Sequence, residues 1–446
     1  MARKLAISTA GILVAPFALV VLVLAALAAR FQNLRRHRRA DAPRLVYGPT
    51  PIIAIKYMRE AIAFRGFDAR TVVDSVLHIN TPGDFDYRIS DLPGGRKEAF
   101  IGLRVLHGLF ARYIVFVWLL FRFDVFHFFF DGGFLAWTPL RFVEVQLLHL
   151  AGKRVVVMPY GGDVIVPSRI RSLEWRQALA SDYPELLTPK RVRRTSRQIR
   201  YFTKRADFIV GCIFHVETLP RWDLLTTHYY PIDTRAWRPE HPGRENDRPE
   251  EPVRVFHSAN HRALKGTEFV IAAIEQLRSE GLEIELVLAE RLPNSEVRRA
   301  LQSCDIVAEQ FIHGYALAAM EAMALGKPVL SNLSDAYYYE IHRLHTGLDE
   351  CPIVSTTVEA LRENLRRLVV DIQLRAELGR ASRGYVVRHH SYETMGRMWE
   401  MIYRTVWNGE PLETTAWHPD AEVRARGDDR SAEIVRATPG LDWRAS

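Results

Sequence analysis

Two segments in the second half of the chain carry residues that could bind a phosphorylated ligand. In the first, His313 and Gly314 open a run of helical pattern that reaches Glu321. Gly314 allows close backbone approach, and the opening amides of a helix can point at an anion. Glu321 lies about two turns along, where a carboxylate can accept hydrogen bonds from two ribose hydroxyls. A surface glutamate on an amphipathic helix is the alternative interpretation.

The second segment is Asn260-His-Arg-Ala-Leu-Lys265-Gly-Thr, between a predicted strand and a predicted helix. Arg262 and Lys265 therefore lie at the carboxyl end of a strand. Cations there could neutralise a diphosphate and stabilise the charge on a departing nucleoside diphosphate. A solvated basic turn is the alternative.

The first half of the chain holds two weaker candidates, both in turns that follow predicted strands. In Tyr160-Gly-Gly-Asp163 the glycines expose backbone, and Asp163 could hold a sugar hydroxyl. In Tyr47-Gly48-Pro-Thr50, Gly48 would let a phosphate or an acceptor come near. Both sequences also occur in ordinary turns.

The elements that must position these residues alternate between strand and helix patterns. In the first half we predict strands Leu45–Tyr47, Thr71–Val76, Val125–Phe130, Arg154–Met158 and Phe208–Gly211, with helices Ile52–Phe64 and Phe142–Leu150. In the second half we predict strands Val253–Ser258, Ile284–Leu288, Asp305–Val307 and Val329–Leu330, with helices Glu268–Ser279, Ser295–Ser303 and Ala316–Leu325. This alternation predicts two α/β domains with parallel sheets, whose carboxyl edges face a ligand-binding cleft.

The chain has 446 residues, which is long enough for two domains. We expect a membrane anchor and basic segment over 1–43, a first domain over 44–237 and a linker over 238–252. A nucleotide-binding domain over 253–390, a terminal helix over 391–408 and a polar, mobile tail over 409–446 follow.

The net charge of +8 is concentrated in the first 45 residues, where eight cations face one carboxylate. The remainder is close to neutral, which argues against a nucleic-acid partner. The three cysteines are scattered without metal-ligand spacing. We therefore expect neither a disulfide framework nor a metal site, and a reducing compartment fits.

Residues 5–29 contain no charge and are long enough to cross a bilayer as a helix. Six cations follow them within fifteen residues, so the positive-inside rule predicts a single-pass anchor with a cytoplasmic catalytic domain. A cleaved signal peptide is the alternative, because Ala26, Ala28 and Ala29 resemble a cleavage site. A second apolar stretch, Leu109–Phe121, predicts a buried helix, with a membrane-surface helix as the alternative.

The second half resembles the nucleotide-binding domain of GT-B glycosyltransferases, in the large retaining family of sucrose and mannosyl transferases. The resemblance rests on Glu321-Ala-Met-Ala-Leu-Gly-Lys-Pro-Val329 and on the Lys265-Gly266 pair. It covers about residues 44–408 and is looser in the first domain. It implies two Rossmann-like domains facing a cleft, a ribose-binding role for Glu321, and a terminal helix at Ser391–Trp407 that crosses back to the first domain.

This chain departs from the family pattern at two positions. His313 stands where the family has its first glutamate, and Tyr160 stands where it has a histidine. Glu309 is an acidic candidate four residues before His313, and His313 itself could bind a sugar hydroxyl or diphosphate. These departures leave open whether the anomeric configuration is retained or inverted.

The sequence therefore predicts transfer of a sugar from a UDP- or GDP-sugar to an acceptor, for which a lipid-linked molecule is one candidate, in cell-envelope or polysaccharide synthesis. Arg262, Lys265, Glu321, Gly48 and Gly314 would bind the donor, with Asp163, His313 and Lys265 at the reaction centre. No cofactor is expected, because the nucleotide sugar is a substrate. A catalytically degenerate binding module and a nucleotide-sugar epimerase are the alternatives.

Overall fold

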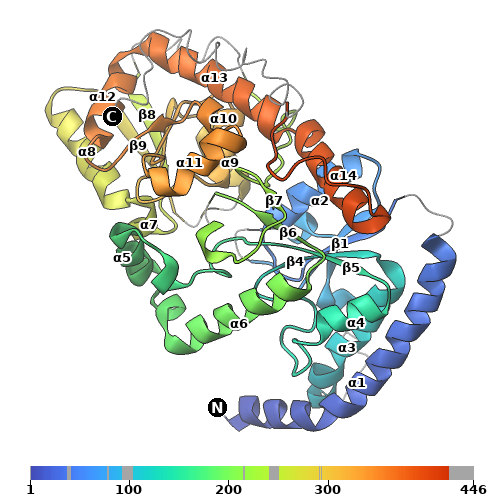
Figure 1. Ribbon diagram of the computed structural model, residues 1–446. Coiled ribbons are helices and arrows are strands. Elements are labelled where there is room, and N and C mark those ends of the chain that lie inside the picture. Colours follow the sequence, from blue (N-terminus) through green and yellow to red (C-terminus); the bar gives the residue numbers. More distant parts are fainter. Residues whose placement is uncertain are drawn as a thin grey trace.

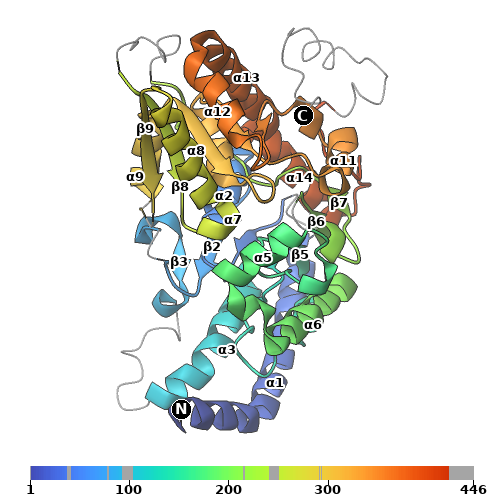
Figure 2. The same ribbon diagram turned by 90° about the vertical axis from the view of Figure 1, so that its left-hand side faces the viewer.

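The computed structural model describes residues 2–37, 42–77, 80–92, 104–213, 216–240, 251–290, 292 and 294–420. Figures 1 and 2 show two α/β lobes, one built from the first half of the chain and one from the second. The predicted linker falls partly outside these residues, since 241–250 are not described. Residues 421–446 of the predicted tail are also outside them.

The first half forms a parallel sheet of seven strands among the described residues, in the order β3-β2-β1-β4-β5-β6-β7. The strands are β1 Leu45–Tyr47, β2 Ala69–Val73, β3 Tyr87–Arg88, β4 Val125–Phe129, β5 Arg154–Met158, β6 Phe208–Gly211 and β7 Leu224–Leu225. The helices are α2 Ala54–Phe64, α3 Arg104–Arg122, α4 Glu144–Leu150, α5 Leu173–Asp182 and α6 Pro189–Arg205. The strand order from β3 to β6 is that of a Rossmann-like domain.

Alternate residues of these strands face two different layers, as the period of a strand requires. Phe126 and Phe128 face the side covered by α3, α4 and α6, whereas Val125 and Phe129 face α2. The predicted buried helix over Leu109–Phe121 is therefore confirmed as α3, which covers the sheet. Its one internal cation, Arg112, pairs with Asp74 at 3.0 Å.

The second half forms a parallel sheet of five described strands, in the order β12-β11-β10-β8-β9. They are β8 Val253–Ser258, β9 Ile284–Ala289, β10 Ile306–Gln310, β11 Val329–Ser331 and β12 Val354–Ser355. The helices are α7 Arg262–Lys265, α8 Thr267–Ser279, α9 Asn294–Gln302, α10 Leu317–Ala324, α11 Ala336–His345, α12 Leu361–Val370 and α13 Ile372–His390. Ala319, Ala322 and Ala324 of α10 are fully buried, and α10 packs against α13.

The chain then returns to the first lobe through α14, Tyr392–Asn408, which packs against α2. The expectation of a mobile tail is wrong for residues 409–420. The backbone amide of Trp417 donates to the carbonyl of Leu225 at 2.7 Å, which ties this segment to β7. Trp417 is also buried. This isolated aromatic residue in a polar sequence was therefore a signal that the segment packs against the protein.

The N-terminal helix α1, Ala2–His37, runs along the outside of the first lobe (Figure 1). It packs against α3 and α4. Val14–Leu34 is long and apolar enough to cross a membrane, with a mean hydropathy of 2.3. A helix that passes this test can also be a signal sequence or lie against a soluble domain, so length and composition alone do not establish a span.

Candidate functional site

Glu321 lies where the two lobes meet. It projects from α10, is 3% exposed, and accepts a hydrogen bond from the hydroxyl of Tyr57 at 2.9 Å. Tyr57 belongs to α2 of the first lobe, so this bond bridges the two lobes. Burial raises the pKa of Glu321 to about 7, although the hydrogen bond from Tyr57 opposes that shift. A carboxylate in this position can accept hydrogen bonds from hydroxyls of a ligand held between the lobes.

Lys265 and the segment before α10 come together through Glu309. Lys265 is largely buried and its ammonium forms an ion pair with the Glu309 carboxylate. The other oxygen of Glu309 accepts the amide of Ala316, just before α10, at 3.3 Å. This carboxylate therefore occupies the position between a buried cation and a helix N-terminus, where an anion is favoured.

Arg262 lies apart from that pair. Its guanidinium is partly exposed and is bound by Glu268 of α8 and by Glu290 after β9. The structure thus brings Lys265 together with the α10 segment, while Arg262 is engaged at the surface.

The start of α7 is also occupied by an acidic side chain. The Asp182 carboxylate, at the end of α5, accepts the amides of Ala263 at 3.2 Å and Leu264 at 2.8 Å. Because Asp182 comes from the first lobe, it forms a second bridge between the lobes. Sequence reasoning missed it, since nothing in the α5 sequence marks a cap for a helix about 80 residues away in the chain.

His313 is enclosed by aromatic rings. Its imidazole stacks on Trp175 of α5, with ring centroids 3.9 Å apart, and its Nδ1 lies 2.9 Å from the hydroxyl of Tyr339. The residue is 7% exposed. His313 therefore joins the segment after β10 to α5 and α11, with the rings of Trp175, Tyr338 and Tyr339 packed on it.

Two Gly-Gly turns at the ends of β4 and β5 build the first lobe's part of the site. Asp131 precedes Gly132 and Gly133, and its carboxylate accepts the Thr50 hydroxyl at 2.9 Å. The hydroxyl of Tyr160 lies 3.5 Å from the same carboxylate. Burial raises the pKa of Asp131 to about 6, against the Thr50 hydrogen bond and the charges of Arg191 and Arg194 on α6.

Asp163 lies beneath this cluster rather than at its surface. It is 1% exposed and accepts the amides of Phe130 at 3.0 Å, Tyr160 at 3.0 Å and Gly161 at 2.9 Å. Burial, and then the nearby charge of Asp131, raise the pKa of Asp163 to about 7. In this arrangement Asp163 fixes the two turns that present Asp131 and Tyr160.

Gly48 and Gly314 both occupy backbone conformations that favour glycine. Gly48 has φ +150°, and a Cβ there would lie 1.9 Å from the carbonyl oxygen of Val72. A glycine at position 48 therefore allows β1 to pack against β2. Gly314 has φ +63°, and its amide donates to the Asn332 carbonyl at 3.0 Å, which shapes the turn before α10.

Sequence reasoning found Glu321, Lys265 and Glu309 but missed Asp131 and Tyr57. Asp131 carried a usable signal, because Asp-Gly-Gly follows strand β4 as Gly-Gly-Asp follows the neighbouring β5. No such signal marked Tyr57, because it lies on the buried face of the amphipathic helix α2, where a core residue is expected.

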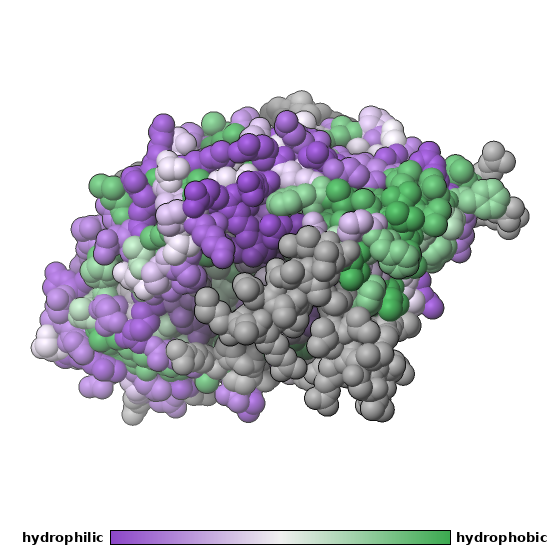
Figure 3. Space-filling view, turned by 90° about the horizontal axis from the view of Figure 1, so that it is seen from below, coloured by the Kyte–Doolittle hydropathy of each residue, from purple (hydrophilic) through white to green (hydrophobic). Residues whose placement is uncertain are grey.

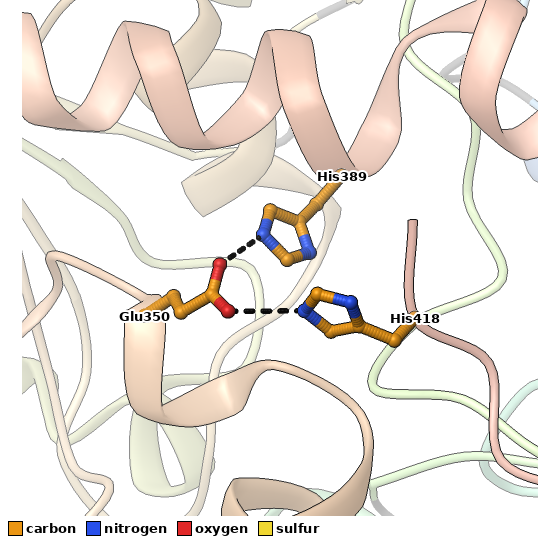
Figure 4. A group of neighbouring side chains, drawn as sticks. All are labelled: Glu350, His389 and His418. Atoms are coloured by element: carbon orange, nitrogen blue, oxygen red, sulfur yellow. Dashed lines mark hydrogen bonds and ion pairs between the residues drawn. The ribbon is translucent and has the colours of Figure 1, made fainter. Parts of the chain in front are cut away.

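A separate cluster brings Glu350, His389 and His418 together, from a short 3₁₀ helix, the end of α13 and the segment after α14 (Figure 4). Nε2 of His389 lies 2.8 Å and Nε2 of His418 lies 3.0 Å from the Glu350 carboxylate, and the three side chains could hold a metal ion by their proximity. Sequence spacing gave no sign of it.

The donors around that cluster do not fit a metal. Nδ1 of His418 accepts the backbone amide of Asp420 at 3.1 Å, so Nε2 carries the ring proton that donates to Glu350. Arg388 also reaches Glu350, at 2.9 Å. Hydrogen bonds from His389 and His418 overcome the effect of burial and hold the pKa of Glu350 well below its usual range. The group is a hydrogen-bonded clamp between the second lobe and residues 409–420.

Comparisons with known proteins bear on the fold. Neither protein-family models nor curated proteins match the sequence. Among solved structures, an alpha-glucosyltransferase in complex with UDP-glucose and DNA containing an abasic site aligns with a TM-score of 0.50 and 12% identity, over 81% of this chain and 99% of its own. The glycosyltransferase SnogD from Streptomyces nogalater aligns with a TM-score of 0.41 and 15% identity, over 80% of this chain and 99% of its own.

At such low identity the likeness establishes architecture and no activity. Two Rossmann-like domains that face each other, with a terminal helix returning to the first, are the GT-B fold. The fold class predicted from the sequence is therefore confirmed, with an apolar helix preceding the first domain.

Proposed function

We propose that this chain is a glycosyltransferase that moves a sugar from a UDP- or GDP-sugar to an acceptor at the cytoplasmic face of a membrane, in cell-envelope or polysaccharide synthesis. The observation that carries the proposal is the position of Glu321, buried between two Rossmann-like domains and bonded to Tyr57. Ribose hydroxyls would replace the Tyr57 hydroxyl on that carboxylate.

The diphosphate would bind beside Lys265 and the start of α10. In the free protein Glu309 pairs with that lysine, so a diphosphate would take over the position that the Glu309 carboxylate now holds. Lys265 would then have an anionic partner both with and without the ligand, as a buried lysine requires. Arg262 would assist if it left Glu268 and Glu290.

The acceptor would bind at the Gly-Gly turns of the first domain. Asp131, with a pKa raised to about 6 by burial, can hold an acceptor hydroxyl and take up its proton near neutral pH. The Asp163 carboxylate would position these turns by accepting the backbone amides of Phe130, Tyr160 and Gly161. His313 would act on the sugar or acceptor after Trp175 moves away.

A binding module without turnover is the second candidate. Lys265 and Arg262 both have carboxylate partners in the free protein, and His313 stacks on Trp175. These contacts occupy the side chains that catalysis would need. A measurement of turnover therefore separates this candidate from a transferase.

A thermal-shift panel across UDP- and GDP-sugars tests donor binding. We expect one nucleotide class to raise the unfolding temperature of the wild type, because a ligand that binds only the folded state stabilises it. Glu321→Gln should lose most of that shift, whereas Glu275→Gln, an exposed carboxylate on α8, should keep it. Equal shifts in all three proteins, or none in any, would rule out the assigned donor site.

A further inference from the structure

The outward face of α1 is a continuous apolar strip. Its large side chains are 44–68% exposed and recur every three or four residues, so they share one side of the helix. They are Phe17, Val20, Val21, Leu24, Leu27, Phe31 and Leu34. Over this length the strip extends about 25 Å at the rise of an α-helix. Exposed apolar surface of this extent indicates a binding partner.

The opposite face of α1 is fixed to the first domain. Ala15, Ala18, Leu22, Ala26 and Ala29 are buried in the same core cluster as residues of α3 and α4. At the C-terminal end, Asn33 donates to the carbonyl of Gly152 at 2.9 Å. The helix therefore contacts protein from Ala15 to Asn33, and lipid could surround this part only if α3 and α4 entered the membrane with it.

The helix α6 provides basic surface on the same side of the molecule. It contains eight cations and no carboxylate, and five of the cations form one exposed face: Lys190, Arg193, Arg197, Arg200 and Lys204. Figures 1 and 2 both place α6 and α1 at the lower end of the molecule, on the first lobe. Seen from below in Figure 3, a strongly hydrophilic area lies beside the apolar surface of α1.

We propose that α1 lies in the plane of a membrane that contains anionic lipids, with its outward face among the acyl chains and the exposed face of α6 against the headgroups. An apolar strip beside basic side chains fits the two layers of such a surface. A second copy of this chain would bring an identical basic face to the contact, and the like charges would repel. The lipid surface is therefore the occupant that the charge favours.

This arrangement replaces a helix that crosses the bilayer with one that rests in a single leaflet. It also places the proposed acceptor site close to the lipid, because Arg191 and Arg194, which act on Asp131, belong to the same helix α6. The lipid contact itself does not rest on the proposed transfer activity, and vesicle binding and sugar transfer are measured separately.

Vesicle co-sedimentation of the full-length protein tests the basic face. We expect binding to phosphatidylcholine vesicles to rise by at least about tenfold when phosphatidylglycerol is included. Replacing Arg193, Arg197 and Arg200 by Glu should remove that gain. The matched control reverses three exposed cations of the second domain, Arg299, Arg367 and Arg380, and should bind as the wild type does. Equal loss in both triple variants, or no preference for anionic vesicles, would overturn the proposal.

The depth of α1 tests whether it lies in the plane. Single cysteines replacing Phe17, Leu24 and Phe31 can be labelled with a fluorophore, since the three native cysteines are buried. Quenchers at fixed depths in the lipid should give the same depth at all three positions. A crossing helix would instead place Leu24 deepest, and labels left unquenched in a dimeric protein would show that a second copy covers this face. Either result would contradict the in-plane arrangement.

Discussion

The hydroxyl of Tyr57 and the carboxylate of Glu321 meet at 2.9 Å although they belong to different lobes. The contact supplies a hydrogen bond to a carboxylate that is only 3% exposed. Such a group is costly to bury alone, so closure of the lobes and satisfaction of Glu321 are coupled. A ribose that offers two hydroxyls could substitute for Tyr57 without leaving Glu321 unpaired.

Nucleotide binding should depend on pH through Glu321. Burial raises its pKa to about 7, so the carboxylate form is lost as the pH falls below that value. We expect the affinity for the bound nucleoside diphosphate to fall by up to about tenfold per pH unit below pH 7. Titration calorimetry at a series of pH values, from alkaline to mildly acidic, measures this affinity. In Glu321→Gln the affinity should vary with pH only through the titration of the nucleotide itself. Parallel profiles of affinity against pH for the two proteins would contradict a nucleotide-binding role for Glu321.

Tyr57→Phe should shift that profile without abolishing binding. The tyrosine hydrogen bond lowers the pKa of Glu321, so its removal should raise the pKa further and move the decline in affinity to higher pH. At alkaline pH the affinity should equal or exceed that of the wild type, because ribose no longer competes with a hydroxyl. A uniform loss at every pH would mean that Tyr57 contacts the nucleotide directly.

Lys265→Ala and Glu309→Gln should have opposite effects on diphosphate binding. Each breaks the buried ion pair and should lower stability. Only Lys265→Ala removes the cation, and we expect at least about tenfold weaker binding of the nucleoside diphosphate. Glu309→Gln leaves the ammonium available and should preserve or tighten binding. Equal losses of affinity in two folded variants, measured by calorimetry at a temperature below both unfolding transitions, would assign the pair to stability alone.

Gly48→Ala should destabilise the first domain through a backbone clash. Its Cβ would lie 1.9 Å from the Val72 carbonyl oxygen, so β1 and β2 would have to separate. We expect a loss of about 3 kcal/mol in the free energy of unfolding. Gly66→Ala is the control, because Gly66 also has positive φ, +87°, but nothing lies within 4 Å of its Cβ position. That variant should lose about 1 kcal/mol. Chemical denaturation measures both free energies of unfolding. Similar losses in the two variants would show that the positive φ, and not the clash, accounts for most of the effect of Gly48→Ala.

Glu350→Gln should destabilise the clamp on residues 409–420 in a pH-dependent way. The pKa of Glu350 is held low by His389 and His418, so its stabilising effect is present above its unfolded pKa and is lost as the pH falls through its folded pKa. At neutral pH we expect a cost of about 3 kcal/mol, which shrinks below about pH 4.5.

Thermal unfolding across this pH range measures the clamp, with the wild type as reference at each pH. Burial also lowers the pKa of His389, so both proteins should lose stability as the pH falls below about 6.5. The difference between them reports Glu350 together with its effect on His389, because Glu350 raises the pKa of that imidazole against burial. Limited proteolysis at neutral pH should cleave residues 409–420 faster in the variant. A pH-independent difference, or unchanged cleavage, would contradict the clamp.

The repeating strand and helix pattern made the fold predictable. Strands Leu45–Tyr47, Arg154–Met158, Phe208–Gly211 and Val253–Ser258 were predicted with the bounds that the structure shows, because a buried parallel strand is a short apolar run between turns. Helix α6 was not predicted. Its apolar positions are few among eight cations, so its composition resembles a solvated segment.

The candidate site was less predictable because its contacts join distant parts of the chain. Tyr57 and Glu321 are 264 residues apart, and no local pattern connects them. Trp175 and Asp182 reach the second lobe from α5, which no sequence motif marked. Lys265 and Glu309 were both noted as candidates, but their pairing depends on β8 and β10 being neighbours in the sheet.

Nucleotide release tests the central proposal most directly. Purified full-length protein is mixed with UDP- and GDP-sugars, with and without a membrane extract that supplies acceptors, and free UDP and GDP are measured. We expect acceptor-dependent release from one nucleotide class in the wild type, and a loss of at least about tenfold in Glu321→Gln. Tight donor binding with no release from any donor would contradict the transferase and leave a nucleotide-sugar-binding module.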